Sequence, residues 1–267
     1  MNVSQSGAST PTVTRLLTTP IKGFSLAQPE SVILEKNGAV GDRDFFITDA
    51  SKQLLSITRA GAFASWQALF DRDRGVLTLT SSDGRVLEDE VVNAADIVVN
   101  FWESQDVAGN VVGGPWSRWL SEIAGQPVEL VRATDPGGAN DVAAVTVVSE
   151  ESVAELGRAT NSEPIDIRRF RMLINLSGVA AYEEETWRPA TVRIGTAVLK
   201  MRGPVPRCNA TTRNPDSGVK DLKTLGLIAE SRGMQPDEFG DEALNMGAYA
   251  DVVEPGVVTV GDRVVFL

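Results

Sequence analysis

Short apolar runs rich in β-branched residues recur along almost the whole chain, separated by clusters of Gly, Asp and Ser. Runs of this kind predict β-strands, and the clusters between them predict turns. The expected strands are residues 13–17, 31–34, 44–47, 76–80, 96–101, 128–131, 144–148, 171–176, 191–194, 197–201, 257–260 and 263–266. Strands and helices do not alternate strictly, so we expect a mainly β fold with appended helices (α+β), in which the β-structure is closed or sandwiched.

Three helices are expected among these strands. The first begins at Pro115 and ends before Gly125, the second is capped by Ser149, and the third ends at Gly233. Their apolar residues at helical spacing are Trp116, Trp119, Leu120 and Ile123 in the first, Val153 and Leu156 in the second, and Leu222, Leu225 and Ile228 in the third. We interpret the two tryptophans of the first helix as core residues rather than ligand contacts.

The composition of residues 133–140, rich in Gly, Asp and Pro, predicts a loop and the best junction between two domains. We therefore expect a β-rich domain at residues 12–133 and a second domain at residues 134–267. Residues 1–11 are small and polar, which predicts a disordered tail without the charged and apolar regions of a secretory signal.

The charge and the cysteine content limit the partners and the compartment. A formal net charge of −11 disfavours a general role in binding nucleic acid. No apolar run approaches about 18 residues, so we expect no membrane span. A single free cysteine suits a reducing compartment, and we expect a cytoplasmic protein.

One cysteine and no histidine remove most catalytic options. A Ser-His-Asp or Cys-His arrangement, a zinc site of several Cys and His ligands, and a Cys-ligated iron–sulfur cluster are excluded. The remaining candidate is Cys208, which directly follows Arg207. A thiolate beside a cation is a nucleophile or a soft-metal ligand. A lone cysteine can also be inert core filler, and the residues alone leave these alternatives open.

Four short segments combine turn residues with positive charge, and together they suit a phosphate-bearing ligand with a soft metal. Each segment by itself is equally compatible with ordinary turn chemistry. They are Thr19-Pro20-Ile21-Lys22-Gly23, Gly41-Asp42-Arg43-Asp44, Thr58-Arg59, and Arg207-Cys208 with the following residues up to Gly218.

The order of these segments resembles the MOSC family, the molybdenum cofactor sulfurase C-terminal domain, together with the β-barrel domain that usually precedes it. The cysteine-centred segment is the most specific part of the resemblance, which covers residues 12–267. The matching segments are Thr19 to Gly23, Gly41 to Ile47, Arg169-Phe170-Arg171 with Asn175-Leu176-Ser177-Gly178, Pro206-Arg207-Cys208 to Gly218, Met246-Gly247-Ala248-Tyr249, Glu254-Pro255-Gly256 and Val260-Gly261-Asp262.

The resemblance implies a MOSC-type β-barrel plus an N-terminal β-barrel-like domain, with molybdopterin as cofactor. Matched residue by residue, Cys208 would be the molybdenum ligand, and Asp141 would be a catalytic residue near the metal. The residues expected to contact the pterin or its phosphate are Lys22, Arg59, Arg171 and Arg207.

The implied reaction is reduction of N-hydroxylated small molecules by a molybdenum-cofactor-dependent oxidoreductase. Without further cysteines the chain has no Cys-ligated electron relay, so a separate electron-transfer protein would be needed. Two other hypotheses stay open: a sulfur carrier or transferase that holds a persulfide on Cys208 and exchanges it with a donor or acceptor, and a non-catalytic module that binds and delivers the cofactor.

Overall fold

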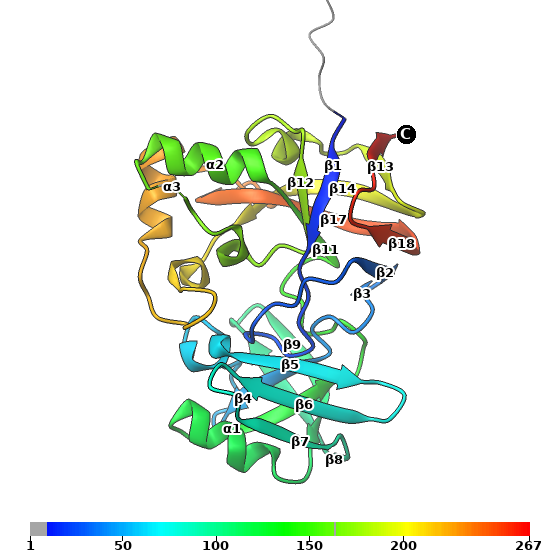
Figure 1. Ribbon diagram of the computed structural model, residues 1–267, viewed down its shortest axis with the longest axis vertical. Helices are drawn as coiled ribbons and strands as arrows, with labels where there is room; N and C mark the ends of the chain where they lie inside the picture. Colours follow the sequence, from blue (N-terminus) through cyan, green and yellow to red (C-terminus); the bar gives the residue numbers. More distant parts are fainter. Residues whose placement is uncertain (1–9, 163) are drawn as a thin grey trace, which may run out of the picture.

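The computed structural model describes residues 10–162 and 164–267, so positions 1–9 of the predicted tail lie outside the described residues. Two β-rich lobes are stacked along the long axis of the molecule (Figure 1). The upper one is called the barrel lobe and the lower one the N-terminal lobe. The predicted α+β class, mainly β with appended helices, is confirmed.

The barrel lobe is built on a seven-stranded sheet that is nearly closed. Its strands, in spatial order, are β1 (Thr12–Leu16), β12 (Ile174–Ser177), β11 (Val145–Ser149), β17 (Asn245–Glu254), β14 (Ala197–Pro206), β13 (Thr191–Ile194) and β19 (Val264–Phe266). The two ends meet, since the Val13 N–H donates to Asp262 O and the Val264 N–H donates to Pro11 O, both at 2.8 Å. Inward-pointing Val, Leu and Ile side chains fill the interior and form the largest apolar cluster of this lobe.

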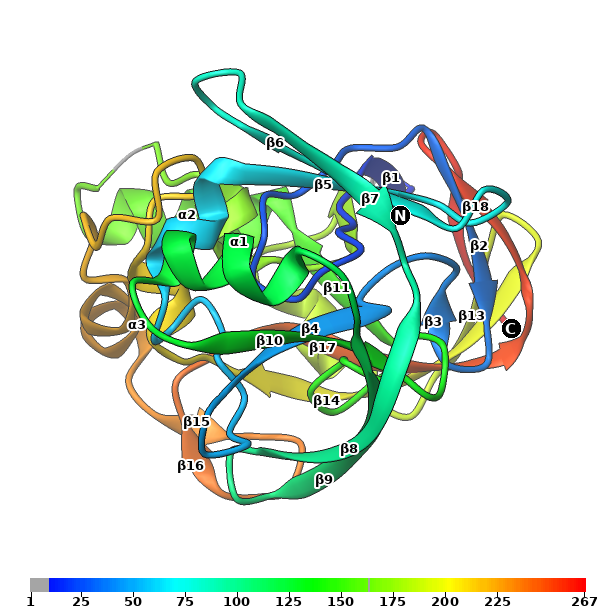
Figure 2. The same ribbon diagram turned by 90° about the horizontal axis from the view of Figure 1, so that it is seen from below.

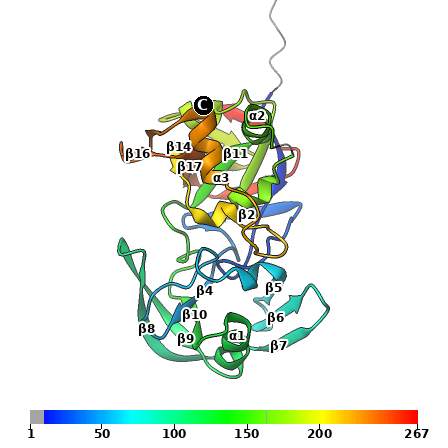
Figure 3. The same cartoon turned by 90° about the vertical axis from the view of Figure 1, so that its left-hand side faces the viewer.

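Two helices cover one side of the barrel, α2 (Glu150–Ala159) and α3 (Thr224–Arg232), and both face the viewer in Figure 3. The predicted cap is confirmed, because the Ser149 hydroxyl accepts the Ser152 N–H at 3.0 Å. Short 3-10 turns complete this lobe: η2 (Ile167–Phe170), η3 (Glu183–Thr186) and η4 (Asn209–Thr212), together with a small ribbon of β15 (Gln235–Pro236) and β16 (Glu242–Ala243).

The N-terminal lobe packs two antiparallel sheets around α1 (Trp116–Ala124), as Figure 2 shows from below. One sheet has the order β4 (Phe45–Asp49), β10 (Val128–Ala133), β9 (Gln105–Val112) and β8 (Asn93–Phe101). The other has β5 (Trp66–Asp71), β6 (Val76–Ser81) and β7 (Val86–Glu90), and η1 (Gly61–Ser65) precedes it. Trp116 is fully buried in the core of this lobe, which confirms its interpretation as a core residue.

The strand pairing crosses the junction predicted after residue 133. Strand β1 belongs to the barrel sheet, and a separate sheet joins β2 (Ser31–Glu35) and β3 (Gly38–Ala39) to β18 (Gly256–Thr259). The chain thus begins in the barrel lobe, builds the N-terminal lobe and returns. Among the described residues, no helix is long and apolar enough to cross a membrane.

All twelve expected strands overlap observed ones, but four longer strands, β5, β7, β9 and β17, were not expected. Strand β17 is buried along most of its length, so it lacks the alternation of polar and apolar residues that identifies a half-buried strand. The strand expected at 171–176 begins only at Ile174, because Arg171 takes a left-handed conformation (φ 54°) that ends η2.

Candidate functional site

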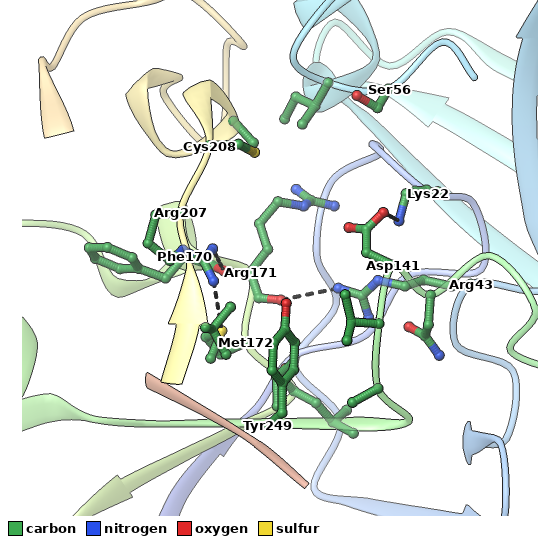
Figure 4. A pocket seen from close by; sticks show the side chains of 18 of the residues that line it. Lys22, Arg43, Ser56, Asp141, Phe170, Arg171, Met172, Arg207, Cys208 and Tyr249 are labelled. Atoms are coloured by element: carbon green, nitrogen blue, oxygen red, sulfur yellow. Dashed lines mark hydrogen bonds and ion pairs between the residues drawn. The ribbon is translucent and has the colours of Figure 1, made fainter. Parts of the chain in front are cut away.

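One pocket lies where the two lobes meet and gathers five of the six predicted site residues: Lys22, Asp141, Arg171, Arg207 and Cys208. Segments that are far apart in the sequence therefore converge on one cavity (Figure 4). Lys22 comes from the N-terminal lobe and Cys208 from the end of β14. Asp141 lies in the loop between the lobes.

Cys208 stands where β14 ends and η4 begins, and its side chain is exposed. The Arg207 N–H still bonds across the sheet to Leu244 O at 2.8 Å, after which the chain leaves the strand. The Thr211 hydroxyl then donates to Cys208 O at 3.1 Å and fixes the turn. The thiol is therefore held at the pocket by a rigid strand end and is accessible, so it is not core filler.

Arg207 packs behind the thiol rather than against it. Its guanidinium donates to Phe170 O at 2.6 Å and lies 3.3 Å from Met172 Sδ, over the Phe170 ring. Its Nε is buried and has no hydrogen-bond partner among the described residues. Burial lowers the pKa of Arg207, although the neighbouring Cys208 opposes this effect.

Arg171 reaches into the middle of the pocket, between Cys208 and the Lys22–Asp141 pair (Figure 4). Its guanidinium makes one hydrogen bond within the described residues, to Phe24 O at 2.7 Å. Arg43, also at φ 54°, donates to Arg171 O at 3.1 Å and ion-pairs with Asp42. Burial, together with the neighbouring charge of Arg43, lowers the pKa of Arg171 to about 9. A cation in this situation is stabilised by an anion that enters the pocket.

Lys22 and Asp141 form an ion pair of 2.9 Å at the opposite side. Lys22 also donates to Ala139 O at 2.7 Å, and the Trp102 indole N–H donates to Asp141 Oδ1 at 3.1 Å. Burial lowers the pKa of Lys22, although Asp141 opposes this effect. Burial raises the pKa of Asp141, but the charge and hydrogen bond of Lys22 outweigh it, and the net shift is downward. The Asp141 carboxylate is therefore ionised at neutral pH.

Tyr249, on β17, is 6 % exposed and lines the same pocket. No hydrogen-bond partner is found for its hydroxyl in the described part of the chain. Burial raises the pKa of Tyr249 to about 12, so the hydroxyl keeps its proton at neutral pH. It is therefore available as a hydrogen-bond donor to a bound molecule.

Arg59 is the predicted site residue that the structure does not bring to the pocket. Its guanidinium is half-exposed and pairs with Asp49 at 2.8 Å. The cause is local: the Ala60 N–H bonds to Ser56 O, and the resulting tight turn directs Thr58 to the pocket and Arg59 away from it. Arg59 therefore does not line the pocket, and its contact with the cofactor stays a prediction.

Among the pocket residues that the sequence analysis did not assign to the site are Arg43, Trp102 and Tyr249. Arg43 and Tyr249 do lie in motif segments, so their signal was present but was not assigned to the site. Trp102 lies at a hairpin tip that no motif marks.

A contact between small residues holds the cysteine segment against the N-terminal lobe. Gly218 packs on Gly61 so closely that a Cβ on Gly218 would overlap the Gly61 carbonyl. Arg213 spans the same contact, donating to Gly218 O at 2.7 Å and to Thr58 O at 2.9 Å. The opposite walls of the pocket are thereby fixed relative to each other.

The side chains that line the pocket favour an anionic ligand that already contains a metal. Four cations and two carboxylates line the cavity, although the chain as a whole has a net charge of −11. No group of three His, Cys, Asp or Glu side chains that could hold a metal occurs within residues 10–162 and 164–267. A soft metal bound here would therefore need Cys208 and ligands from its own cofactor. The residues fit such a group.

A comparison with protein families matches residues 134–265 to the MOSC domain. Among curated proteins, the chain is 24% identical to a molybdenum cofactor sulfurase of Oryza sativa subsp. japonica, over 98% of this chain and 35% of the rice protein. It is 32% identical to the mitochondrial amidoxime-reducing component 1 of Homo sapiens, over 53% of this chain and 42% of the human protein.

Among solved structures, the YUAD protein from Bacillus subtilis covers 96% of this chain and 94% of its own, at 13% identity and a TM-score of 0.47. The chain spans about a third of the rice sulfurase and less than half of the human protein. Residues 134–265, the part that matches the MOSC domain, carry Cys208, Arg207, Arg171, Asp141 and Tyr249.

Proposed function

We propose that this protein binds the molybdenum cofactor in the pocket between its lobes and reduces N-hydroxylated compounds, with Cys208 as the molybdenum ligand. The observation that carries the proposal is the exposed thiol of Cys208 in one cavity with two partly buried cations, Arg171 and Arg207, that form no ion pair within the described residues. The MOSC domain supports it, as do relatives whose names include a molybdenum cofactor sulfurase and amidoxime-reducing components.

Different residues of the pocket would bind different parts of the cofactor, according to their chemistry. Cys208 would bind the metal, while Arg171, Arg207 and Lys22 would hold the anionic part of the cofactor by charge-assisted hydrogen bonds. When bound, the cofactor supplies the two-electron redox chemistry. Ionised Asp141 would orient a cationic or N–H-bearing substrate, and the protonated Tyr249 hydroxyl would donate a hydrogen bond to its oxygen. Electrons would come from a separate protein, since no second cysteine is present.

A second candidate is a sulfur carrier that exchanges a Cys208 persulfide with a donor and an acceptor. The exposure of the thiol favours it, as does the match of 98% of this chain to a sulfurase. It gives no role to the unpaired cations of Arg171 and Arg207, whereas an anionic cofactor does. A module that only delivers the cofactor would use the same pocket without turnover.

The test is the metal and pterin content of protein purified from a host that makes the cofactor, with an absorption spectrum and reduction of benzamidoxime by a supplied electron donor. We expect stoichiometric molybdenum and turnover in the wild type, and loss of both in Cys208→Ser. Asn209→Ala, at the exposed neighbouring position, is the matched control and should keep the metal.

Molybdenum retained by Cys208→Ser would exclude Cys208 as the ligand. Cofactor without turnover would favour the delivery module. Protein without molybdenum that carries a persulfide on Cys208 would favour the sulfur carrier.

A further inference from the structure

Four of the residues that line the pocket are exposed, and three of them mark one side of its mouth. Trp102 lies at the tip of the β8–β9 hairpin, while Asp141 and Val142 lie in the loop that contacts this tip. The Trp102 indole N–H donates to Asp141 Oδ1 at 3.1 Å, and Gln105 Nε2 donates to Asp141 O at 3.1 Å. The pocket therefore opens beside the hairpin tip.

The small ribbon of β15 and β16 projects on the same side of the molecule. Its turn lies beside the tip of the β8–β9 hairpin in two perpendicular views (Figure 2 and Figure 3). The ribbon also packs against the strands behind the pocket, because Glu238 pairs with Arg202 at 2.8 Å. The Arg202 guanidinium in turn lies 5.9 Å from the centre of the Tyr249 ring, which lines the pocket. The hairpin tip and the ribbon turn therefore flank the same mouth.

The ribbon turn is well ordered by its own hydrogen bonds, yet it holds an aromatic side chain in water. The Asp237 carboxylate accepts the Phe239 N–H at 2.7 Å and the Asp241 N–H at 3.0 Å. The Gly203 N–H donates to the Glu238 carboxylate, and a Cβ on Gly203 would overlap Glu238. Phe239 is nevertheless 65% exposed. An apolar ring fixed in water gains free energy when a partner covers it.

Carboxylates surround the exposed aromatic rings of both tips. Residues 102–106 and 237–242 contain no lysine or arginine and six acidic residues, which are Glu103, Asp106, Asp237, Glu238, Asp241 and Glu242. Of these six, only Glu238 forms an ion pair within the described residues. We call these two segments together with Val142 the mouth patch. Its unpaired negative charge around an apolar centre is complementary to a protein surface with Lys and Arg around an apolar centre.

The position of the mouth patch indicates the kind of protein that would cover it. The fourth exposed residue of the pocket is Cys208, so the end of the pocket that would hold the metal is also open. Electrons pass between redox centres only over short distances, and a donor must therefore approach this opening. The chain has no second cysteine for a relay of its own.

We propose that the mouth patch is the docking surface for a small electron-transfer protein whose redox centre is surrounded by basic residues. The inference rests on the proposed function, which requires an external donor, and it adds the face and the charge by which the donor is recognised. Reduction of one N-hydroxylated molecule takes two electrons and two protons and releases water, so a one-electron carrier would dock twice per turnover. Short-lived complexes of this kind have small interfaces and depend on charge.

The experiment measures binding of two purified electron carriers to the full chain by calorimetry at an ionic strength of about 10 mM. Cytochrome c, with lysines around its haem edge, is the basic probe, and flavodoxin, with carboxylates around its flavin, is the acidic one. We expect cytochrome c to bind at least about 10-fold more tightly than flavodoxin. Its affinity should fall at least about 10-fold when the ionic strength is raised to about 150 mM.

Two triple variants with the same change in net charge locate the surface. Glu103→Gln with Asp241→Asn and Glu242→Gln removes three carboxylates of the mouth patch and should weaken cytochrome c about 10-fold. The matched control changes Asp73→Asn, Glu88→Gln and Glu90→Gln in the sheet of β5, β6 and β7, which lies on the opposite side of the molecule (Figure 2). It should stay within about threefold of the wild type.

The apolar part of the mouth patch is tested by a second matched pair. Phe239→Ser should weaken cytochrome c about fivefold, since an apolar ring is lost from the interface. Leu69→Ser, at a position of β5 that is 66% exposed, should stay within about twofold. All four variants are at exposed positions, and an unchanged urea midpoint would show that each is folded.

Equal losses in the two triple variants, equal losses in the two serine variants, or flavodoxin binding as tightly as cytochrome c would overturn the inference. Failure of the proposed function has a different signature, namely protein without molybdenum that still binds cytochrome c at the mouth patch. Molybdenum and turnover in a protein that does not bind cytochrome c would overturn the docking inference alone.

Discussion

The cations that the two lobes contribute to the pocket are compensated in opposite ways. On the N-terminal lobe, Lys22 pairs with Asp141 and Arg43 pairs with Asp42. On the barrel lobe, Arg171 and Arg207 donate only to backbone carbonyls and a thioether within the described residues. Both barrel-lobe arginines have a pKa lowered by burial.

This difference indicates which side of the pocket needs a bound anion to compensate its charge. A buried cation without a counter-charge destabilises the folded protein, so it persists where a ligand supplies the missing charge. Lys22 and Arg43 are already paired with carboxylates, so Lys22 would contribute less to the binding of an anion than the two barrel-lobe arginines. The barrel lobe, which also carries Cys208, therefore provides the cations that are available to bind an anion.

The largest expected effect comes from breaking the contact that joins the two lobes. Gly218→Ala should lower the free energy of unfolding by at least about 3 kcal/mol, because its Cβ would overlap the Gly61 carbonyl at a φ of +70°. Urea unfolding measures this. Gly240→Ala has a similar φ of +90° with open space around it, and should cost only about 1 kcal/mol. Similar losses in the two variants would show that the lobe contact is not tight.

The comparison between the lobes is tested most directly by removing the central cation. Arg171→Gln should weaken the affinity of the protein for the pterin about 100-fold, since a charge-assisted contact to the anion is lost. The same change in cofactor-free protein should not lower its stability in urea, because an uncompensated charge is removed. Arg59→Gln, outside the pocket, should retain the pterin within about twofold. Equal losses in both variants would contradict the division of roles.

The ion pair of the N-terminal lobe predicts a pH dependence. The pKa of Asp141 in the folded protein is lowered, so its stabilising contribution is present above its unfolded pKa of about 3.9 and is lost as pH falls through the folded value. Asp141→Asn should therefore be about 1 kcal/mol less stable than the wild type at pH 7, a small value because the carboxylate is half-exposed. The two unfolding curves should converge below about pH 4; a difference that persists there would show that charge is not its cause.

The smallest effect concerns the hydroxyl of the barrel lobe. Both tyrosines of the chain, Tyr182 and Tyr249, have a pKa raised chiefly by burial, and that of Tyr249 is raised to about 12. A near-ultraviolet titration should show little tyrosinate at pH 10, where a free tyrosine is about half-ionised. Tyr249→Phe should change the free energy of unfolding by less than about 0.5 kcal/mol, since no bond within the described residues is lost. Normal titration at pH 10 would show that Tyr249 is open to solvent.

Much of the fold follows from local sequence patterns. The strands that these patterns did not predict differ from typical strands for physical reasons. Strand β7 carries Glu88, Asp89 and Glu90, which have low strand propensity but sit on an exposed sheet. Strand β17 is buried along most of its length and contains Gly247, so neither alternation nor propensity marks it. Both depend on partners that are distant in the sequence.

A site residue could be predicted where its residue type or motif is distinctive. It could not be predicted where the local backbone conformation determines which side chain points into the pocket. Cys208 stands out as the only thiol of the sequence. The order of the motifs identified the other candidates, which are Lys22, Arg171, Arg207 and Asp141. No sequence pattern gives the tight turn that directs Arg59 outward, nor the hairpin that brings Trp102 over the pocket. Such positions are set by the docking of the lobes, which a single sequence does not encode locally.

Two strands that precede the N-terminal lobe in the sequence complete the sheets of the barrel lobe: β1 pairs with β12 in the barrel sheet, and β2 pairs with β18 in the separate sheet. A fragment starting near residue 134 would leave the amide and carbonyl groups of Ile174–Ser177 and Gly256–Thr259 open to pairing with other molecules. We therefore expect the matched segment not to be an autonomous folding unit: expressed alone it should self-associate, and adding residues 10–39 as a separate peptide should restore a soluble monomer.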